Sequence, residues 1–538
     1  MKKIILPIII AIVALAACKG KVKKEKIVIS SIDKSISPAN AYNSFFLDSM
    51  ALEKFLAADK PEAGVADKVR NFYYSRNFEF AWLTETGLTE QARGFWNLHS
   101  YYTNYNKQDT ALNNDKALNK IMGRLNETEE ASLKATDSST IYAELTLTEQ
   151  FIVYLEKNFE SGVLKYNSLE SFVPKKKLAT MEVAKNILQT KEDDFEKENQ
   201  AYKLVKSKLK QYYDLALKGG WPQIAFVGKP LKKGVSVPQI ASIKKRLQLT
   251  GELSGNDTTA LFDDAFEQGV KNFQTSYGYT PDGKLGDSLI KLMNVPITQK
   301  LQQIIINLNR MRWLPVEKEG RLIVANIPEY KLHVYENDKE AFNMRIVVGK
   351  EGHNTVIFSG KLSEIVFSPY WNLPSGIVEK EIMPSIQKNS NYLAKHNMEQ
   401  TGESNGIPVI RQKPGGNNSL GKVKFLFPNA FNIYFHDTPA KSLFEKDVRA
   451  YSHGCIRLSE PQKLAEYILQ NQDGWNSQKI VEAMNAGQEN SVAVKKPIPV
   501  IITYYTAWIG DNSQLNFRSD IYDHDALMAK RMFTDASL

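Results

Sequence analysis

The segment Tyr451-Ser452-His453-Gly454-Cys455-Ile456-Arg457-Leu458 places a cysteine thiol beside an imidazole and near a guanidinium. A nucleophilic thiol needs a base or a positive charge close by, and an acyl oxyanion needs N–H donors that converge on one point. Gly454 allows backbone conformations closed to other residues, so that neighbouring amides can turn toward such a point. Ser459-Glu460-Pro461-Gln462 then indicates a capping box, which predicts that the cysteine lies on a loop leading from a strand to a helix.

The N-terminus bears on this thiol, because the chain has only two cysteines, Cys18 and Cys455. A short basic start, an apolar run from 4 to 14 and the ending Leu15-Ala16-Ala17-Cys18 indicate a signal peptide at 1–17 that resembles a bacterial lipobox. The alternative is an ordinary signal peptide with an incidental cysteine. If Cys18 carries lipid, Cys455 has no disulfide partner and is either buried and inert or a nucleophile.

From about residue 321 onward, short runs of β-branched and aromatic residues are separated by Gly, Pro or Asn. This pattern is typical of β-strands joined by turns. The predicted strands are Leu332–Val334, Phe342–Val348, Ile365–Phe367, Val423–Phe427, Asn432–His436 and Val500–Tyr505. We therefore expect a mostly β domain at 319–525, with a tail at 526–538. A helix-prone stretch at 376–410 interrupts the domain, and an insertion of that length is a candidate lid.

Within the predicted strand Asn432–His436, the side chains of Tyr434 and His436 share one face. A histidine at the end of such a strand can reach the thiol as a general base. Of the seven histidines in the chain, only His436 and His453 lie within about twenty residues of Cys455.

Residues before 319 are predicted to be helical. Apolar residues at helical spacing indicate a scaffold at 41–225, after a Lys/Ser-rich flexible linker at 18–40. Three helices are expected at 226–296: one from Pro238, one from Phe262 to Phe273, and one whose N-cap is Asp287 or Ser288. A connecting helix follows at 297–318. The fold class is thus multidomain α+β.

Two resemblances follow from these motifs. The string AFEQGVKNFQTSYGYTPDGKLGDSLIKLMNV, within 226–296, resembles a small helical peptidoglycan-binding domain. His436, followed nineteen residues later by Cys455 within Ser-His-Gly-Cys-x-Arg, resembles the YkuD-like L,D-transpeptidases. Further matches at 411–439 and 506–522 resemble the large periplasmic branch of that family, which combines a helical scaffold, a wall-binding domain and a catalytic domain with a lid.

The resemblance implies a role for each motif residue. Cys455 would be the nucleophile and His436 its base, while His453, Gly454 and Cys455 would stabilise the oxyanion through backbone amides. Arg457 would hold a carboxylate of the stem peptide, for which a guanidinium fork is suited. Tyr434 would add a hydroxyl near the oxyanion. A structural ion pair for Arg457, loop packing for His453 and a purely structural Tyr434 are the alternatives.

The resemblance also implies the reaction. A donor tetrapeptide stem would lose its terminal D-alanine to form a thioester on Cys455, and the amine of a second stem would resolve it as a 3→3 cross-link. Water as acceptor would make an L,D-carboxypeptidase, and a dead β domain would leave a wall-binding lipoprotein. A zinc site at His436, Asp437, His453 and Cys455 lacks the paired spacing of structural sites.

The expected partners are therefore peptidoglycan stem peptides and glycan, and a membrane bound through the lipid on Cys18. We expect no cofactor and no metal. We also expect no nucleic acid, because the sequence has no run of basic residues interleaved with aromatic ones. The net charge of +9 fits an anionic polymer and an ordinary basic surface equally. Lys19 after the lipidated cysteine suggests the outer membrane, facing the periplasm.

Overall fold

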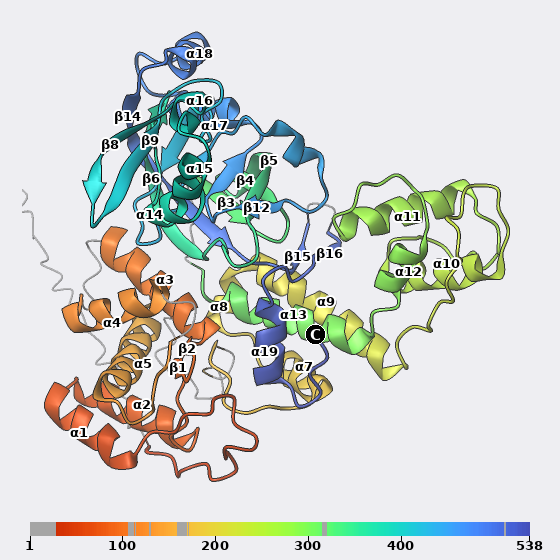
Figure 1. Cartoon of the computed structure of the whole chain (residues 1–538). Coiled ribbons are helices and arrows are strands. Elements are labelled where there is room, and N and C mark those ends of the chain that lie inside the picture. Colours follow the sequence, from red (N-terminus) through yellow and green to blue (C-terminus); the bar gives the residue numbers. More distant parts are fainter. Residues whose placement is uncertain are drawn as a thin grey trace, which may run out of the picture.

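The computed structural model describes residues 28–105, 112, 114–127, 131–158, 169, 172–314, 320–510 and 513–538. Three lobes surround a central group of helices: a helical N-terminal lobe, a small helical lobe and a mostly β lobe (Figure 1). This arrangement confirms the multidomain α+β class. The predicted signal peptide and Cys18 lie outside the described residues. Within the described ranges, no helix is both long and apolar enough to cross a membrane.

The N-terminal lobe is helical, as predicted, with one small hairpin. Its elements are α1 (Ser49–Asp59), α2 (Ala63–Tyr74), β1 (Leu83–Thr84), β2 (Gly87–Leu88), α3 (Glu90–Tyr105), α4 (Lys116–Glu127) and α5 (Ser138–Asn158). Aromatic residues fill its core, with Trp82, Phe95 and Phe151 fully buried. The linker does not extend to residue 40 as a free tether, because Ile36 is buried and the amide of Asp33 donates to the carbonyl of Tyr74.

The central helices come from distant parts of the chain. They are α7 (Thr180–Gln189), α8 (Asp194–Glu198), α9 (Gln200–Leu217), α13 (Ile297–Met311) and α19 (His524–Met532). Their side chains share a core with the small helical lobe, whereas residues 47–173 have a core of their own. Arg310 of α13 binds both Glu90 of the N-terminal lobe and Asp525 of α19. The predicted scaffold 41–225 therefore divides between two cores, and much of the predicted tail belongs to the central group.

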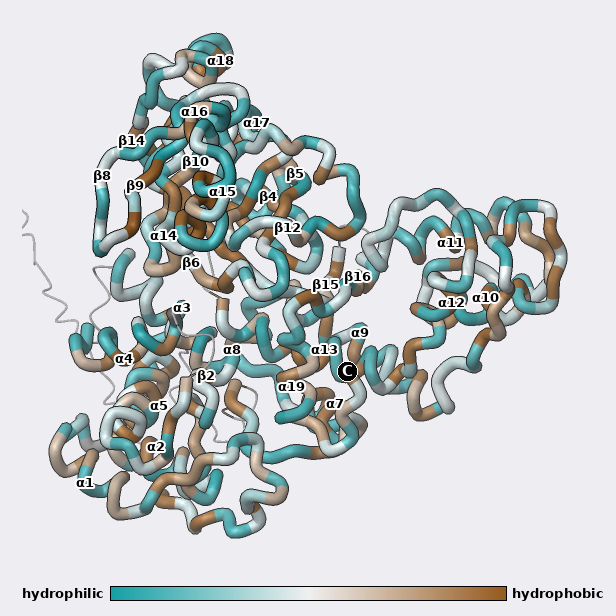
Figure 2. The backbone as a smooth tube through the Cα atoms, viewed as in Figure 1, coloured by the Kyte–Doolittle hydropathy of each residue, from teal (hydrophilic) through white to brown (hydrophobic). Residues whose placement is uncertain are grey.

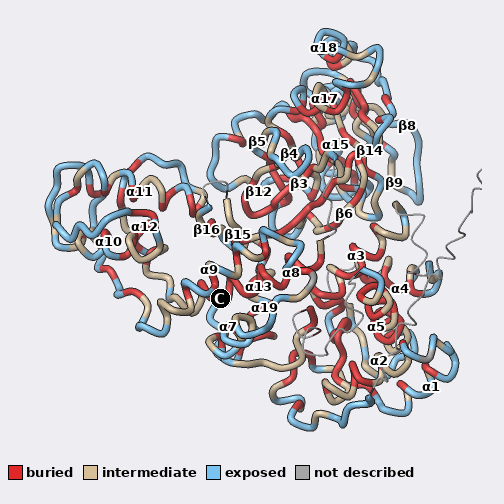
Figure 3. Tube along the Cα trace, turned by 180° about the vertical axis from the view of Figure 1, so that it is seen from behind, coloured by how far each residue is buried: buried red, intermediate tan, exposed pale blue. Residues whose placement is uncertain are grey.

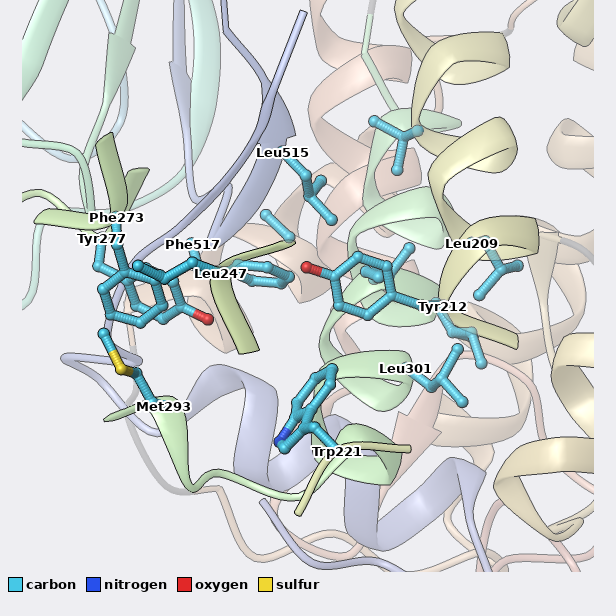
Figure 4. Packing of buried hydrophobic residues seen from close by; sticks show 14 of the residues in the cluster. Leu209, Tyr212, Trp221, Leu247, Phe273, Tyr277, Met293, Leu301, Leu515 and Phe517 are labelled. Atoms are coloured by element: carbon cyan, nitrogen blue, oxygen red, sulfur yellow. The ribbon is translucent and has the colours of Figure 1, made fainter. Parts of the chain in front are cut away.

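The small lobe contains the three predicted helices, α10 (Pro238–Thr250), α11 (Asp264–Ser276) and α12 (Asp287–Met293). The N-cap predicted for the third helix is wrong: the cap is Gly286, and the Asp287 carboxylate instead accepts backbone N–H groups of Val227 and Gly228. Figure 4 shows Tyr277 of this lobe beside Phe517, which lies near the C-terminus in the strand Leu515–Phe517, and Tyr212 of α9 facing the same cluster. Aromatic packing thus joins this lobe to the rest of the chain.

The β lobe is built on one sheet, in which the described residues place nine strands in the order β12-β5-β13-β11-β10-β6-β14-β3-β4. An additional pairing of β5 with β4 closes the sheet on itself. Its strands are β3 (Arg321–Asn326), β4 (Lys331–Glu336), β5 (Lys339–Gly349), β6 (Phe358–Phe367), β10 (Val423–Leu426), β11 (Phe435–His436), β12 (Ala450–Ser452), β13 (Ile456–Leu458) and β14 (Asn490–Thr503).

Buried and more exposed side chains alternate along several of these strands, so one face of the sheet forms the core of the β lobe. Figure 2 shows hydrophobic residues concentrated along the strands and hydrophilic residues in the outer loops, and Figure 3 shows the same strands buried. Helices α17 (Pro461–Leu469) and α18 (Ser477–Asn485) add buried side chains such as Leu464 and Ile480 to this core. A separate two-stranded sheet, β15 (Ala507–Ile509) with β16 (Leu515–Phe517), leads back to the central helices.

The helix-prone insertion is a small unit with its own apolar cluster. It contains α14 (Ser375–Ile377), the π-helical turn η1 (Val378–Ile382), α15 (Met383–Lys388), α16 (Tyr392–Lys395), and the strands β7 (Trp371–Asn372), β8 (Met398–Ser404) and β9 (Ile407–Gln412). Its buried residues are Leu373, Val378, Ile382 and Ile410. The predicted helices are confirmed, and the structure adds a three-stranded sheet, β7-β9-β8, to them.

Candidate active site

Cys455 lies in a tight loop between two short strands that both pair with β5. Strand β12 runs parallel to β5, and β13 runs antiparallel to it, so the chain reverses direction at Cys455. The prediction of a strand-to-helix loop is therefore wrong, because β13 separates the cysteine from α17. The predicted capping box is also wrong: in the described chain Glu460 is the N-cap and its side chain makes no capping hydrogen bond. Pro461 starts the helix instead, since its fixed φ suits the first turn.

Two hydroxyl groups hold this loop in shape. Ser452 Oγ donates to the carbonyl of Cys455 at 2.6 Å and accepts the amide N–H of Gly454 at 3.2 Å. Thr355 Oγ1 donates to the carbonyl of Gly454 at 2.8 Å. Gly454 has a φ of 109°, which a residue with a side chain rarely adopts, so the sequence prediction for this glycine is confirmed. Ser452 and Thr355 were not predicted to support the site.

His436 lies on β11, the strand beside β13. The pairing of β11 with β13 is parallel and places His436 opposite Arg457. The predicted strand from Asn432 is shorter than expected: only Phe435–His436 is a strand, and Asn432 has a φ of 53°, which ends extended pairing. The Nδ1 atom of His436 lies 2.5 Å from the carbonyl oxygen of Asp437. Because a carbonyl only accepts, Nδ1 carries the hydrogen and Nε2 keeps a lone pair in the neutral ring.

Burial makes both the imidazole and the thiol neutral. It lowers the pKa of His436 to about 3, and the positive charge of Arg457 is the second cause. Burial also raises the pKa of the Cys455 thiol, although hydrogen bonding with Tyr434 opposes this shift. At neutral pH the site therefore holds a protonated thiol and an unprotonated imidazole. A thiol and an imidazole in these states can act by general-base catalysis, in which the proton leaves sulfur as a carbonyl is attacked.

Tyr434 and Arg457 flank the thiol. The Tyr434 side chain counteracts the rise in the pKa of the Cys455 thiol, and the rings of Tyr434 and His436 have centroids 5.8 Å apart. The thiol also points at the carbonyl of Asn432, with a separation of 3.7 Å. Among the described residues, Arg457 has no ion-pair partner, and its Nε atom is buried without a hydrogen bond. The alternative role for Arg457, a structural ion pair, is thus not found among the described residues, and the guanidinium remains able to bind an anionic ligand.

His453 points to the insertion. Its Nε2 atom lies 3.0 Å from Oε1 of Glu381 on η1, and its ring packs against His353 with a centroid distance of 4.9 Å. Sequence reasoning missed Glu381, because nothing local relates a residue on the insertion to a loop 72 positions away. Of the six predicted residues, His453, Gly454 and Cys455 lie on the loop and Arg457 lies on β13. His436 lies on the neighbouring strand β11, Tyr434 lies just before it, and the insertion contributes the side chain of Glu381.

Comparisons with known proteins match three parts of the chain to protein families. Residues 320–501 match the model of the YkuD L,D-transpeptidase catalytic domain. This part of the chain belongs to the YkuD family. Residues 67–209 match a scaffold domain, and residues 236–293 match the family described as "Putative peptidoglycan binding domain".

One relative and two solved structures place the match in context. The chain is 31% identical over 244 residues to a "Putative L,D-transpeptidase" of Haemophilus influenzae, covering 43% of this chain and 48% of that protein. The match thus spans about half of the relative's length. An L,D-transpeptidase of Stackebrandtia nassauensis is 13% identical with a TM-score of 0.22, covering 52% of this chain and 97% of its own. One from Mycobacterium smegmatis is 16% identical with a TM-score of 0.20, covering 34% and 58%.

Proposed function

We propose that this YkuD-family protein is a peptidoglycan L,D-transpeptidase that forms 3→3 cross-links through a thioester on Cys455. The single observation that carries this proposal is the parallel pairing of β11 with β13, which places His436 opposite Arg457, two residues after Cys455. An L,D-transpeptidase needs a nucleophile that attacks a peptide carbonyl and then releases the acyl group to an amine, and a cysteine with a base meets both needs.

In the first half-reaction, Sγ of Cys455 attacks the carbonyl carbon of the third residue of the donor stem. His436 Nε2 takes the thiol proton and then gives it to the leaving amine of D-alanine. The Gly454 amide already donates to Ser452, so the amide of Cys455, which has no acceptor among the described residues, is the better oxyanion donor. The Tyr434 hydroxyl, which influences the pKa of the thiol, would join it as a second donor.

Arg457 would hold the donor stem. A guanidinium that no carboxylate of the described chain neutralises is a ready partner for a carboxylate of the stem peptide, which it binds through two parallel hydrogen bonds. The match of residues 236–293 to a peptidoglycan-binding family supports binding of the wall polymer by the small helical lobe. Peptidoglycan would then be held at one lobe and cross-linked at another.

We further propose that Cys18 is lipidated and anchors the protein, facing the periplasm, most simply in the outer membrane. The support is the sequence Leu15-Ala16-Ala17-Cys18 after an apolar run, followed by Lys19. One acyl chain anchors only marginally, so two or three are expected on the cysteine. Partition of the full chain into a detergent phase, and loss of that partition in Cys18→Ala, is the measurement.

The function is tested by analysing muropeptides from cells that express the wild type or Cys455→Ser. We expect 3→3 linked dimers from the wild type and none from the variant. Val448→Ala is a matched control, because Val448 is exposed on the loop that leads into β12 and should leave the product pattern unchanged. Accumulation of tripeptide stems without dimers would make the protein an L,D-carboxypeptidase. Equal products from wild type and Cys455→Ser would show that this thiol does not take part in the reaction. The alternative function, a non-catalytic wall-binding lipoprotein, would then be favoured.

A further inference from the structure

The insertion places a carboxylate against the loop of the nucleophile. Oε1 of Glu381 lies 3.0 Å from Nε2 of His453. Glu381 belongs to the π-helical turn η1, whose buried residues Val378 and Ile382 anchor it in the apolar cluster of the insertion. The side chains of Glu381 and His453 remain 53% and 36% exposed. The pair is therefore fixed by the fold and still open to a ligand.

This contact orients the imidazole. A carboxylate only accepts hydrogen bonds, so in the neutral ring of His453 the hydrogen is on Nε2 and the lone pair is on Nδ1. The ring of His353 packs against the same imidazole at 65° and restricts its rotation. A carboxylate that fixes the tautomer of a histidine near a nucleophile is the general arrangement of a catalytic base and its orienting group. His453 is two positions before Cys455.

The two histidines near Cys455 differ in their surroundings. His436 is 4% exposed, on a strand between β10 and β13, and Asp437 occupies its Nδ1. His453 is on the exposed loop and faces the insertion. After the first half-reaction a second stem must reach the thioester from solvent with an ammonium group, and such a group is drawn to a carboxylate on its way in.

We propose that Glu381 and His453 form the acceptor site, which binds the primary ammonium group of the second stem and deprotonates it. This inference rests on the proposed function. His453 would be a catalytic base that touches the acceptor nitrogen, and Glu381 a positioning residue that also attracts the ammonium. Since Glu381 belongs to the insertion, the acceptor site is complete only when the insertion lies against the loop of Cys455.

The proposed step balances as follows. His453 Nδ1 removes one proton from the ammonium and releases it to solvent. The free amine attacks the thioester carbon and forms the C–N bond, and its second proton passes through His453 to sulfur as the C–S bond breaks. The thioester and the ammonium thus become an amide, the thiol of Cys455 and one released proton. Water carries no charge for Glu381 to attract, so the site favours transfer to an amine over hydrolysis.

The test uses the purified full chain with a tetrapeptide muropeptide as both donor and acceptor. For wild type and Glu381→Gln it measures the rate of acylation by a carbapenem, the ratio of cross-linked dimer to tripeptide, and the acceptor KM. General acid–base catalysis typically contributes about 10²–10⁴-fold, so we expect the dimer ratio to fall at least about tenfold in Glu381→Gln. Acylation should stay within about twofold, because His436 serves that step. Glu381→Asp should restore part of the ratio.

Glu379→Gln is the matched control, since Glu379 is an exposed glutamate on the same turn. It should leave both measurements unchanged. An unchanged dimer ratio in Glu381→Gln would overturn the proposal. Equal losses in acylation and in dimer ratio would also overturn it, because Glu381 would then only support the loop. If the wild type is never acylated, the proposed function itself fails, and that result is distinct from both.

Discussion

Acylation of Cys455 should keep almost all of its rate when the pH falls from 7 to 5. The reason is the depressed pKa of His436, which burial and then the charge of Arg457 lower to about 3. With that value, about 99% of the imidazole is still unprotonated at pH 5, whereas a free histidine with a pKa of about 6.5 would keep only about 3%. The raised pKa of the Cys455 thiol means that there is no thiolate population to lose.

The same shift has a cost in stability. The unfolded chain binds a proton at His436 below about pH 6.5, but the folded chain does so only near pH 3, so the unfolded state gains protons first as the pH falls. The contribution of His436 is fully present above pH 6.5 and is lost as the pH falls toward 3. At pH 5 that loss is about 2 kcal/mol, from roughly 1.5 pH units at 1.36 kcal/mol each.

The assay therefore measures the acylation rate and the folded state of the protein at the same pH values. Carbapenem acylation is followed by mass spectrometry at pH 5, 6 and 7, with the intact reagent quantified at each pH. Circular dichroism at the same pH values shows whether the protein is folded. We expect rates within about twofold for folded protein. A fall of about twentyfold at pH 5, with the protein still folded, would mean that the base titrates like a solvated histidine. That result would refute the assignment of the buried His436 as the base.

Three further changes give distinct expectations. Replacing residues 376–410 by a short Gly/Ser linker should raise the ratio of tripeptide to dimer, since water then reaches the thioester; an unchanged ratio in a folded variant would deny the insertion a role in choosing the acceptor. Gly421→Ala should lower stability by about 1–3 kcal/mol and slow acylation, because Gly421 has a φ of 62° and a Cβ would meet the Asp437 side chain; melting curves and the carbapenem assay measure both. Arg457→Lys should reduce kcat/KM for the donor about tenfold without lowering the melting temperature, because no described carboxylate loses a partner.

Local patterns predicted much of the fold. The strands of the β lobe and the helices of the small lobe follow from apolar periodicity, which depends only on neighbouring residues. Where prediction went wrong, another local effect was stronger. Pro461 rather than Ser459 set the start of α17, and the left-handed Asn432 shortened the predicted strand. Asp287 satisfies backbone groups of a preceding loop instead of capping its own helix.

The assignment of elements to cores was beyond the reach of sequence reasoning. Helices α7 and α9 show ordinary amphipathic spacing, and that spacing does not tell which lobe they cover. They pack with α13 and α19, which are distant in sequence, and contribute no buried residue to the core of the N-terminal lobe. The periodicity of a single helix shows which face is apolar but not which other helix packs against that face. The sequence therefore could not show that residues 41–225 contribute to two separate cores.

The candidate site shows the same contrast. The resemblance to the YkuD signature identified Cys455 and His436, but the parallel pairing of β11 with β13 that brings their strands together is a tertiary fact. Thr355, which holds Gly454 from a position 99 residues away, gave no sequence signal. Glu381 gave none either. Such supporting residues act through shape and one or two hydrogen bonds, and several residue types can supply those bonds.

The neutral state of the thiol gives the site a chemical rationale. If Cys18 carries lipid, the enzyme works outside the reducing cytoplasm, where a free thiolate would be oxidised because thiolate character governs susceptibility. Desolvation raises the pKa of the half-buried Cys455 thiol, and burial lowers the pKa of His436, so at neutral pH the thiol is protonated and the imidazole is not. Under the proposed function, the reactive sulfur would therefore be generated only while a carbonyl is being attacked. Desolvation of two groups, rather than a permanent ion pair, allows one unpaired cysteine to be both durable and reactive.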